Sequence, residues 1–335
     1  MSVATGKLVI PRPGASTPLQ APVPGPSEAA FTETFGRLLP PAKFVTTAQG
    51  KAAYYQFPPS ISSSSDDSAP RRVVLIHGVQ TPALGMFPLS RVLRESFPNA
   101  TVVILELWGH GLSDALVTPH VPELFHDLLD QLLDKLHWSS AHLVGYSFGA
   151  VCAAGYTNFQ PGRVQSLTLV APAGFIDSSK FSPEEQEHLK HDCDEEAAAK
   201  WVFNFLEGGD LIVPTDWKER VAKGEVVAEA IKDWEMREHP GHPATVVAVL
   251  RDGGAMDFHQ EYLKTSSLDV PSFVVLGELD GLNNEKEVKD HGFQHVAVVP
   301  AAGHAVVRDR AVEVGGFIRD FWNTLGSEKS DDQIY

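Results

Sequence analysis

The most specific chemical motif in the chain is the pentapeptide Gly-Tyr-Ser-Phe-Gly at residues 145–149. It follows the apolar run 141–144 and precedes a helix-compatible segment. A serine on a tight turn between a strand and a helix needs glycines two residues away on each side, because side chains there would collide with both elements. The pattern therefore predicts that Ser147 is a nucleophile and that Gly145 and Gly149 shape its turn.

A serine hydroxyl is a weak nucleophile at neutral pH, so Ser147 requires a base, normally a histidine, and an acid that orients it. His304 follows the last apolar run, and Asp280 follows the apolar run 272–276. We expect both at the carboxyl edge of a parallel sheet, where open α/β sheets hold their ligands. The chain order Ser147, Asp280, His304 is the nucleophile, acid and base order typical of that architecture. Glu278 is the neighbouring carboxylate most easily confused with Asp280.

The elements that must position these residues follow from short, wholly apolar runs that alternate with helical patterns. Runs that are apolar on both faces predict a mostly parallel sheet covered by helices on both sides. A hairpin over 42–48 and 51–57 adds two strands, so we expect about eight strands in an α/β fold. The clearest helices cover 122–137 and 309–325. The six strands predicted from the apolar runs cover residues 73–76, 101–105, 141–144, 166–170, 272–276 and 295–299.

The strand pattern stops between residues 173 and 265, where charged helical sequence contains scattered Trp and Phe. Ser182 followed by Glu185 is a helix-start signal in this segment. We therefore predict a helical insertion, or cap, at 173–265 and a core made of 36–172 and 266–326. Residues 1–35, with six prolines in 11–30, are expected to form an extended, flexible arm, 62–70 a flexible loop and 327–335 a flexible tail.

Composition limits the partners of the chain. With 27 basic and 43 acidic residues, the formal net charge is −16, which disfavours binding to nucleic acid or to an anionic membrane. No secretory signal and no apolar stretch of about 18 residues is evident, so we expect a soluble, cytoplasmic protein without membrane insertion. Cys152 and Cys193 lack metal-site spacing and are expected to be free thiols. We expect neither a metal nor a cofactor.

These motifs together resemble the α/β-hydrolase superfamily over about residues 40–325. His77-Gly78 resembles the oxyanion loop of that family, and the segment GHGLSD at 109–114 resembles its GHGxSD turn. The resemblance implies that the backbone N–H groups of Val79 and Phe148 form an oxyanion hole, and that the insertion is a mobile cap over the serine.

The chain also departs from the family pattern. Glu106 stands where the family often has Asp, and Gln80-Thr81-Pro82 replaces the usual small or aromatic residues after His-Gly. Some members carry the acid after the sixth strand, where Asp177 is the only nearby candidate.

The resemblance implies a serine hydrolase that cleaves a carboxylic ester or lactone of a small lipophilic substrate. Tyr146, Trp201, Phe205 and Trp217 are the candidate substrate-binding residues, while Phe203 and Trp234 are further aromatics of the cap. The same triad also serves lyases, C–C bond hydrolases and ring-forming enzymes, and some relatives are non-catalytic ligand receptors. The oligomeric state is left open.

Overall fold

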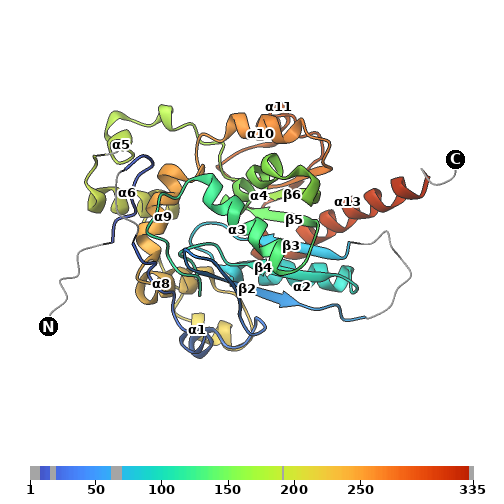
Figure 1. Cartoon of the computed structure of the whole chain (residues 1–335), viewed down its shortest axis with the longest axis horizontal. Coiled ribbons are helices and arrows are strands. Elements are labelled where there is room, and N and C mark those ends of the chain that lie inside the picture. Colours follow the sequence, from blue (N-terminus) through green and yellow to red (C-terminus); the bar gives the residue numbers. More distant parts are fainter. Residues whose placement is uncertain (1–7, 16–19, 62–69, 191, 332–335) are drawn as a thin grey trace.

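The computed structural model describes residues 8–15, 20–61, 70–190 and 192–331 of the 335-residue chain. Its centre is one eight-stranded sheet with the order β1-β2-β4-β3-β5-β6-β7-β8 (Figure 1). The β1–β2 and β2–β4 pairs are antiparallel and all other pairs are parallel, which confirms the predicted, mostly parallel sheet. The strands are β1 (Lys43–Thr46), β2 (Lys51–Phe57), β3 (Arg72–Ile76), β4 (Thr101–Leu105), β5 (Ala141–Tyr146), β6 (Val164–Val170), β7 (Ser272–Gly277) and β8 (Val296–Val299).

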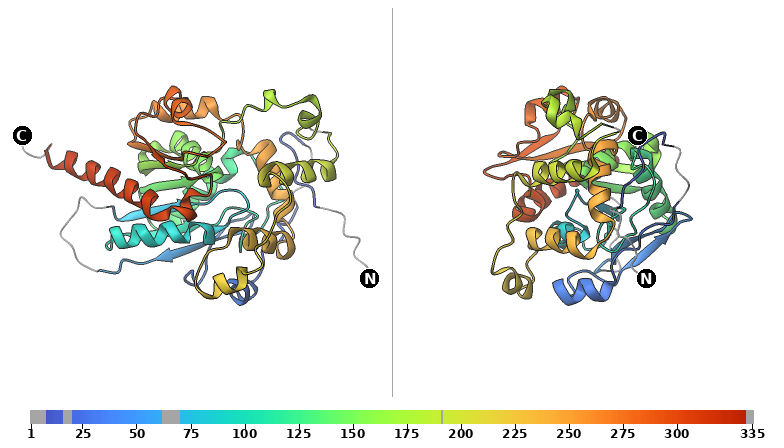
Figure 2. Two further views of the ribbon diagram at one scale, coloured as in Figure 1. Left: turned by 180° about the vertical axis from the view of Figure 1, so that it is seen from behind. Right: turned by 90° about the vertical axis from the view of Figure 1, so that its left-hand side faces the viewer.

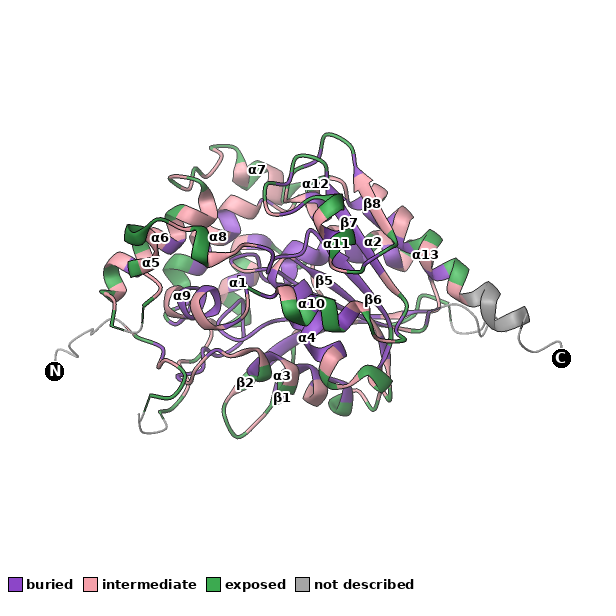
Figure 3. Cartoon of the chain, turned by 90° about the horizontal axis from the view of Figure 1, so that it is seen from above, coloured by how far each residue is buried: buried purple, intermediate pink, exposed green. Residues whose placement is uncertain are grey.

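Helices cover both faces of the sheet, which explains why the central strands are apolar on both sides. One face carries α3 (Pro122–Lys135), α4 (Phe148–Phe159) and α10 (His259–Ser266), and the other carries α2 (Phe87–Ser96), α12 (Val306–Asp309) and α13 (Ala311–Asp331) (Figures 1 and 2). The short α11 (Glu285–Asp290) packs beside β8. The strands are buried at the centre in Figure 3, between two apolar clusters. The sheet therefore forms a rigid base for the loops at its carboxyl edge.

The segment between β6 and β7 is helical, as predicted. Ser182 accepts the Glu185 N–H while the Glu185 side chain accepts the Ser182 N–H, so the capping box begins α5 as expected. Most of these helices lie at one end of the sheet (Figure 1). The exception is α10, which packs against α4 and helps to cover the sheet. The domain boundary expected at residue 265 therefore falls inside this helix. The other insertion helices are α5 (Pro183–Glu187), α6 (Glu195–Glu207), α7 (Trp217–Ala222), α8 (Ala228–Glu238) and α9 (His242–Asp252).

The expected extended arm is wrong for its last part, because residues 28–35 form helix α1 (Glu28–Phe35). The Ser27 hydroxyl caps this helix by accepting the Ala30 N–H. Phe31 and Phe35, one helical turn apart, are buried against Trp234 of α8. Composition concealed this helix, because the preceding proline-rich stretch dominated the pattern and the apolar partner lies far away in the sequence.

The C-terminal end also differs from expectation, since α13 continues to Asp331 and the predicted tail at 327–335 is helical over 327–331. Glu and Lys in this stretch are good helix formers, which accounts for the extension. Residues 332–335, most of the expected loop at 62–70, and residues 1–7 and 16–19 of the arm lie outside the described residues. In the described parts of the chain, no helix is long and apolar enough to span a membrane.

Candidate active site

Ser147 lies on the sharp turn between β5 and α4, with φ 53° and ψ −117°. This conformation is costly for a residue with a side chain and persists only where its surroundings impose it. A Cβ added to Gly145 would lie 2.3 Å from the Gly149 carbonyl oxygen, and one added to Gly149 would lie 2.2 Å from the Ile76 carbonyl oxygen. The two glycines therefore let β5, α4 and β3 approach closely enough to hold the serine in place.

A chain of two hydrogen bonds joins Ser147, His304 and Asp280. The Ser147 hydroxyl lies 2.9 Å from His304 Nε2, and His304 Nδ1 lies 2.9 Å from Asp280 Oδ2. An ionised carboxylate can only accept, so the Nδ1 atom carries the proton and the Nε2 lone pair faces the serine hydroxyl. The second Asp280 oxygen accepts the Leu282 N–H at 3.0 Å, which fixes the carboxylate. This arrangement allows His304 to take a proton from Ser147.

The two other candidate acids lie elsewhere. Glu278 is exposed and accepts the Ala301 N–H at 2.7 Å, so it stabilises the loop that carries His304 without contacting the histidine. Asp177 accepts from Ser179 at the start of the insertion. Of the three carboxylates considered, only Asp280 reaches His304.

Neighbouring strands bring the acid and the base together. Asp280 lies in the loop after β7 and His304 in the loop after β8, and the Leu279 N–H donates to the Ala302 carbonyl across these loops at 2.8 Å. A Cβ on Gly277 would lie 2.5 Å from the carbonyl oxygens of Ala302 and Gly303, so glycine is required where the loops cross. The parallel β7–β8 pair thus places both side chains at one edge of the sheet.

Two backbone amides beside Ser147 are available to a ligand. Val79 and Phe148 line the cavity that contains the serine, and within the described chain neither amide donates to a protein acceptor. Phe148 begins α4, where helical N–H groups lack intrahelical partners. A Cβ on Gly78 would lie 2.8 Å from the Ser147 Cβ, so this glycine lets the loop pass directly against the serine. The N–H groups of Val79 and Phe148 are therefore placed where they could donate hydrogen bonds to an oxyanion that develops beside Ser147.

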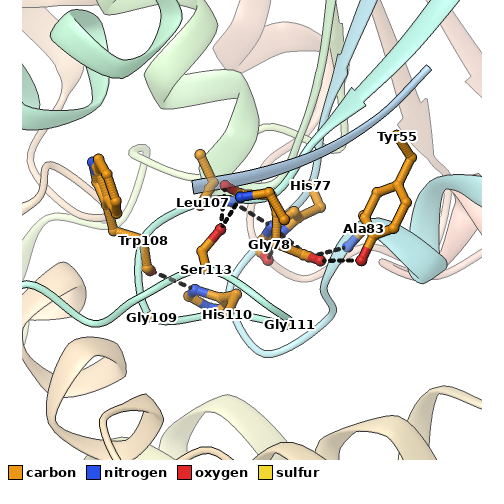
Figure 4. A network of polar contacts seen from close by, with 12 residues as sticks. Tyr55, His77, Gly78, Ala83, Leu107, Trp108, Gly109, His110, Gly111 and Ser113 are labelled. Carbon is orange, nitrogen blue, oxygen red and sulfur yellow. Dashed lines mark hydrogen bonds and ion pairs between the residues drawn. The ribbon is translucent and has the colours of Figure 1, made fainter. Parts of the chain in front are cut away.

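Two buried histidines hold this loop (Figure 4). His77 Nδ1 lies 2.7 Å from the Gly78 carbonyl, and its Nε2 accepts the Leu107 N–H at 3.0 Å. His110 Nδ1 lies 2.9 Å from the Trp108 carbonyl, and its Nε2 accepts the Gln80 N–H at 3.2 Å. Each ring thus acts as one donor and one acceptor, which is the neutral form. Burial favours that form, because it lowers the pKa of His77 to about 4 and that of His110 well below its usual value.

Two buried carboxylates lie behind the histidines. Glu106 accepts the Ala83 N–H at 2.6 Å and the Tyr55 hydroxyl at 3.2 Å, and burial raises its pKa to about 7. Glu235 of α8 accepts the Gly111 N–H at 3.0 Å, and burial raises its pKa well above the usual range. The sequence analysis missed Glu235, because a charged residue on a helix normally faces solvent. Glu106 thus joins β2 to the segment after β3, and Glu235 attaches the 109–114 turn to the insertion.

The cavity around Ser147 has a volume of about 510 Å³, which suits a small organic molecule. Ser147, Asp280 and His304 all contribute to its lining. Apolar and polar side chains share the rest of its wall. The main apolar ones are Ile176, Phe205, Leu206, Leu250 and Leu282, and the polar ones are Gln80, Thr81, Glu207, Lys232 and Arg308.

Of the four candidate substrate-binding residues, Tyr146 and Phe205 line this cavity and Trp201 and Trp217 do not. Trp201 lies one helical turn before Phe205 and stacks on its ring at 5.3 Å. Trp217 lies 6.3 Å from the ring of Phe35. These tryptophans pack the insertion against its own helices and against the arm.

The other two cap aromatics also lie away from the cavity. Phe203 lines a different surface hollow together with Met236, and Trp234 is buried against Phe31. The sequence analysis did not single out the charged lining residues Glu207, Lys232 and Arg308, because a charged residue on a helix normally faces solvent.

Cys152 and Cys193 are both free, and Cys152 is buried in α4. No group of three or more His, Cys, Asp or Glu side chains in the described ranges could hold a metal ion.

Comparisons with known proteins agree with this architecture. Residues 71–197 match a family model described as alpha/beta hydrolase fold. A 2-hydroxy-6-oxononadienedioate/2-hydroxy-6-oxononatrienedioate hydrolase from Burkholderia vietnamiensis is 34% identical over 121 residues, which are 35% of this chain and 41% of that protein. The chain spans between 20% and 41% of the length of the first three curated relatives that it matches.

Two solved structures show the same fold over most of the chain. The enol-lactonase from Burkholderia xenovorans LB400 has a TM-score of 0.59 and 20% identity, covering 84% of this chain and 100% of its own. The carboxylesterase CesB from Bacillus subtilis has a TM-score of 0.61 and 18% identity, covering 88% and 97%.

Proposed function

We propose that this chain is a serine hydrolase of the α/β-hydrolase superfamily and that it cleaves a carboxylic ester or lactone of a small substrate through an acyl-enzyme on Ser147. The observation that carries the proposal is the pair of 2.9 Å contacts from Ser147 to His304 and from His304 to Asp280, at the wall of a cavity large enough for such a substrate. The likeness to an enol-lactonase and a carboxylesterase supports the same bond type.

The first half of the reaction forms the acyl-enzyme. His304 Nε2 takes the hydroxyl proton as Ser147 Oγ bonds to the carbonyl carbon, and the carbonyl oxygen becomes negative beside the N–H groups of Val79 and Phe148. Asp280 stabilises the imidazolium that forms. His304 then gives its proton to the leaving alkoxide oxygen as the carbon–oxygen bond breaks. Loss of one oxyanion donor typically costs about 3 to 4 kcal/mol of activation free energy.

The second half repeats these steps with water. His304 takes a proton from a water molecule, whose oxygen attacks the acyl carbon, and returns that proton to Ser147 Oγ as the acid departs. In a lactone the first half only opens the ring, so the leaving alcohol stays attached to the acyl group until water releases the hydroxy acid.

We also propose that the insertion sets substrate choice, because Phe205 and Leu206 of α6 and Lys232 of α8 line the cavity while the reacting residues lie outside the insertion. Removal of one apolar contact in such a cavity changes discrimination by about 1 to 3 kcal/mol. Phe205→Ala therefore tests the role of the insertion in substrate choice better than Trp201→Ala, which serves as its control.

A second candidate function is C–C bond hydrolysis with the same three residues. The observation in its favour is the 34% identity with the Burkholderia vietnamiensis hydrolase over 121 residues. A panel containing p-nitrophenyl esters, lactones and a vinylogous diketone distinguishes the two, because a C–C hydrolase turns over the diketone with the higher kcat/KM.

The test of the proposed function combines labelling with turnover. A fluorophosphonate probe is expected to modify Ser147, as located by mass spectrometry, and Ser147→Ala is expected to abolish both labelling and ester hydrolysis with an unchanged circular dichroism spectrum. Ser267→Ala, an exposed serine at the end of α10, is the matched control and should behave as the wild type. Labelling of another serine, or ester binding without turnover in the wild type, would overturn the proposal and favour a receptor.

A further inference from the structure

Arg308 of α12 is a cation in the wall of the Ser147 cavity that has no acidic partner. Among the described residues no carboxylate forms an ion pair with it, and its buried Nη1 atom lacks any hydrogen-bond partner. The other cation of the cavity, Lys232, is 2.9 Å from Glu207 and thus already neutralised. Among the described residues, the cavity therefore contains one guanidinium without an ion-pair partner.

The guanidinium lies on the same wall as the reacting residues. Its Cζ is 5.5 Å from the centre of the Tyr146 ring, and that ring is 5.3 Å from the ring of His304. A Cβ built on Gly85 would lie 3.7 Å from both Arg308 Nη1 and the Thr81 hydroxyl oxygen, so the guanidinium also faces the oxyanion loop. A ligand group bound to Arg308 would thus belong to a molecule within reach of Ser147.

Two acids lie near Tyr146, Asp280 and Asp309, and in the described part of the chain neither forms an ion pair with Arg308. Asp280 is held by His304 Nδ1 and the Leu282 N–H. Tyr146 contacts the guanidinium through its ring and through a side-chain hydrogen bond, and Nη1 is the atom left without a partner. Burial of an N–H group without a partner is unfavourable, and the planar fork of an arginine matches a carboxylate with two parallel hydrogen bonds.

We propose that Arg308 binds a carboxylate of the substrate, so that the preferred ester or lactone carries a second, ionised carboxyl group. This inference rests on the proposed function and specifies its substrate class. The apolar side chains of Ile176, Leu206 and Leu250 accommodate the hydrocarbon between the two carboxyl groups. The substrate is then amphipathic rather than wholly lipophilic.

The experiment compares two acyl groups of similar length on the same leaving group, mono(p-nitrophenyl) glutarate and p-nitrophenyl pentanoate. We expect the wild type to prefer the glutarate ester. Arg308→Gln is expected to lower kcat/KM for that ester roughly 10- to 100-fold, the range set by a charged hydrogen bond, with little change for the pentanoate. Arg308→Lys should retain part of the preference, because it keeps the charge and loses the fork. Arg310→Gln is the matched control, because Arg310 already pairs with Glu313.

A second pair, 3-acetoxybenzoate and 3-acetoxybenzamide, tests a carboxylate on the leaving group, and a preference that depends on Arg308 in either pair supports the proposal. Equal losses of kcat/KM for the charged and the neutral esters in Arg308→Gln would overturn it, since Arg308 would then only hold Tyr146 in position.

Calorimetric titration with glutarate provides a readout that does not require turnover. Arg308-dependent glutarate binding without ester hydrolysis would leave the carboxylate site standing and contradict the proposed function. If the wild type neither binds glutarate nor prefers the charged ester over the neutral one, the proposed carboxylate site is wrong.

Discussion

Asp280 and Glu278 are chemically similar and two residues apart, but the loop after β7 separates their roles. The backbone turn that directs the Asp280 N–H to the Gly277 carbonyl at 3.1 Å turns the Asp280 side chain inward to His304. Glu278 is left on the exposed side, where it binds the Ala301 N–H. Position within the turn, rather than residue type, therefore decides which carboxylate contacts His304.

This difference makes a direct prediction at the residue scale. Asp280→Asn is expected to lower kcat roughly 10⁴-fold, because the amide favours the wrong tautomer of His304 and cannot stabilise the imidazolium. Glu278→Gln, the matched control, should remain within a few-fold of the wild type. Both variants are compared by steady-state hydrolysis of an activated ester. A larger loss in Glu278→Gln than in Asp280→Asn would contradict the assigned acid.

At the scale of elements, adjacent glycines in α13 occupy different environments. Gly315 faces α2, where an added Cβ would lie 2.4 Å from Val92 Cγ1 and 3.0 Å from Val92 Cβ. An added Cβ on Gly316 meets no atom within 4 Å. The absence of a side chain at Gly315 thus sets how closely α13 approaches α2 on this face of the sheet.

We therefore expect opposite effects of the same substitution at these two positions. Gly315→Ala should lower the free energy of unfolding by about 1 to 3 kcal/mol through overpacking. Gly316→Ala should raise it by up to about 1 kcal/mol, because alanine has the higher helix propensity. Urea unfolding monitored by circular dichroism measures both, and equal effects would show that α13 can shift away from α2.

The sequence predicted those parts of the site that depend on strand order and missed those that depend on packing. Ser147, Asp280 and His304 follow apolar runs directly, so their common edge was foreseeable. The positions of Arg308 and Glu235 depend on which face of a short helix meets the cavity or the 109–114 turn. The sequence does not show which side of a helix packs against the rest of the fold, so the surroundings of these two charged residues could not be predicted from it. The same limit placed Trp201 in the cavity, although it lies behind Phe205.

At the scale of the whole molecule, the buried polar network connects regions that are distant in sequence. Tyr55 of β2, the loop after β3 and the 109–114 turn lie close together around His77 (Figure 4). Glu106 binds Tyr55 and the Ala83 N–H, and Glu235 of α8 binds the Gly111 N–H. The core strands, the loop after β3 and the insertion therefore share one set of hydrogen bonds. Protonation at its centre should affect the stability of the entire chain.

The raised pKa of Glu106 gives the direction of this effect. Its pKa is about 7 in the folded chain and 4.5 in the reference state, so between these values the folded state binds more protons than the unfolded state. The Glu106 contribution is therefore fully present below about pH 4.5 and is lost as the pH rises through 7. Tyr55, His77 and Glu235 are the titratable groups that face it.

Glu106→Gln tests this coupling, because the amide resembles the protonated acid and does not ionise. The free energy of unfolding of the wild type, relative to this variant, should fall as the pH rises from 4.5 to 7 and change little outside that window. Urea titrations at several pH values supply the difference. Parallel pH profiles for the two proteins would show that folding does not raise the pKa of Glu106.

Helix α1 also has a consequence for synthesis of the chain. Phe31 and Phe35 leave the ribosome well before Trp234, against which they are buried. At 5 to 20 residues per second, the delay is roughly 10 to 40 s. During that interval the strands from β1 to β6 become available to pair, while these two rings have no partner in α8. The apolar side of α1 is therefore synthesised well before its partner in α8, and until then its rings are open to contact with chaperones or with other nascent chains.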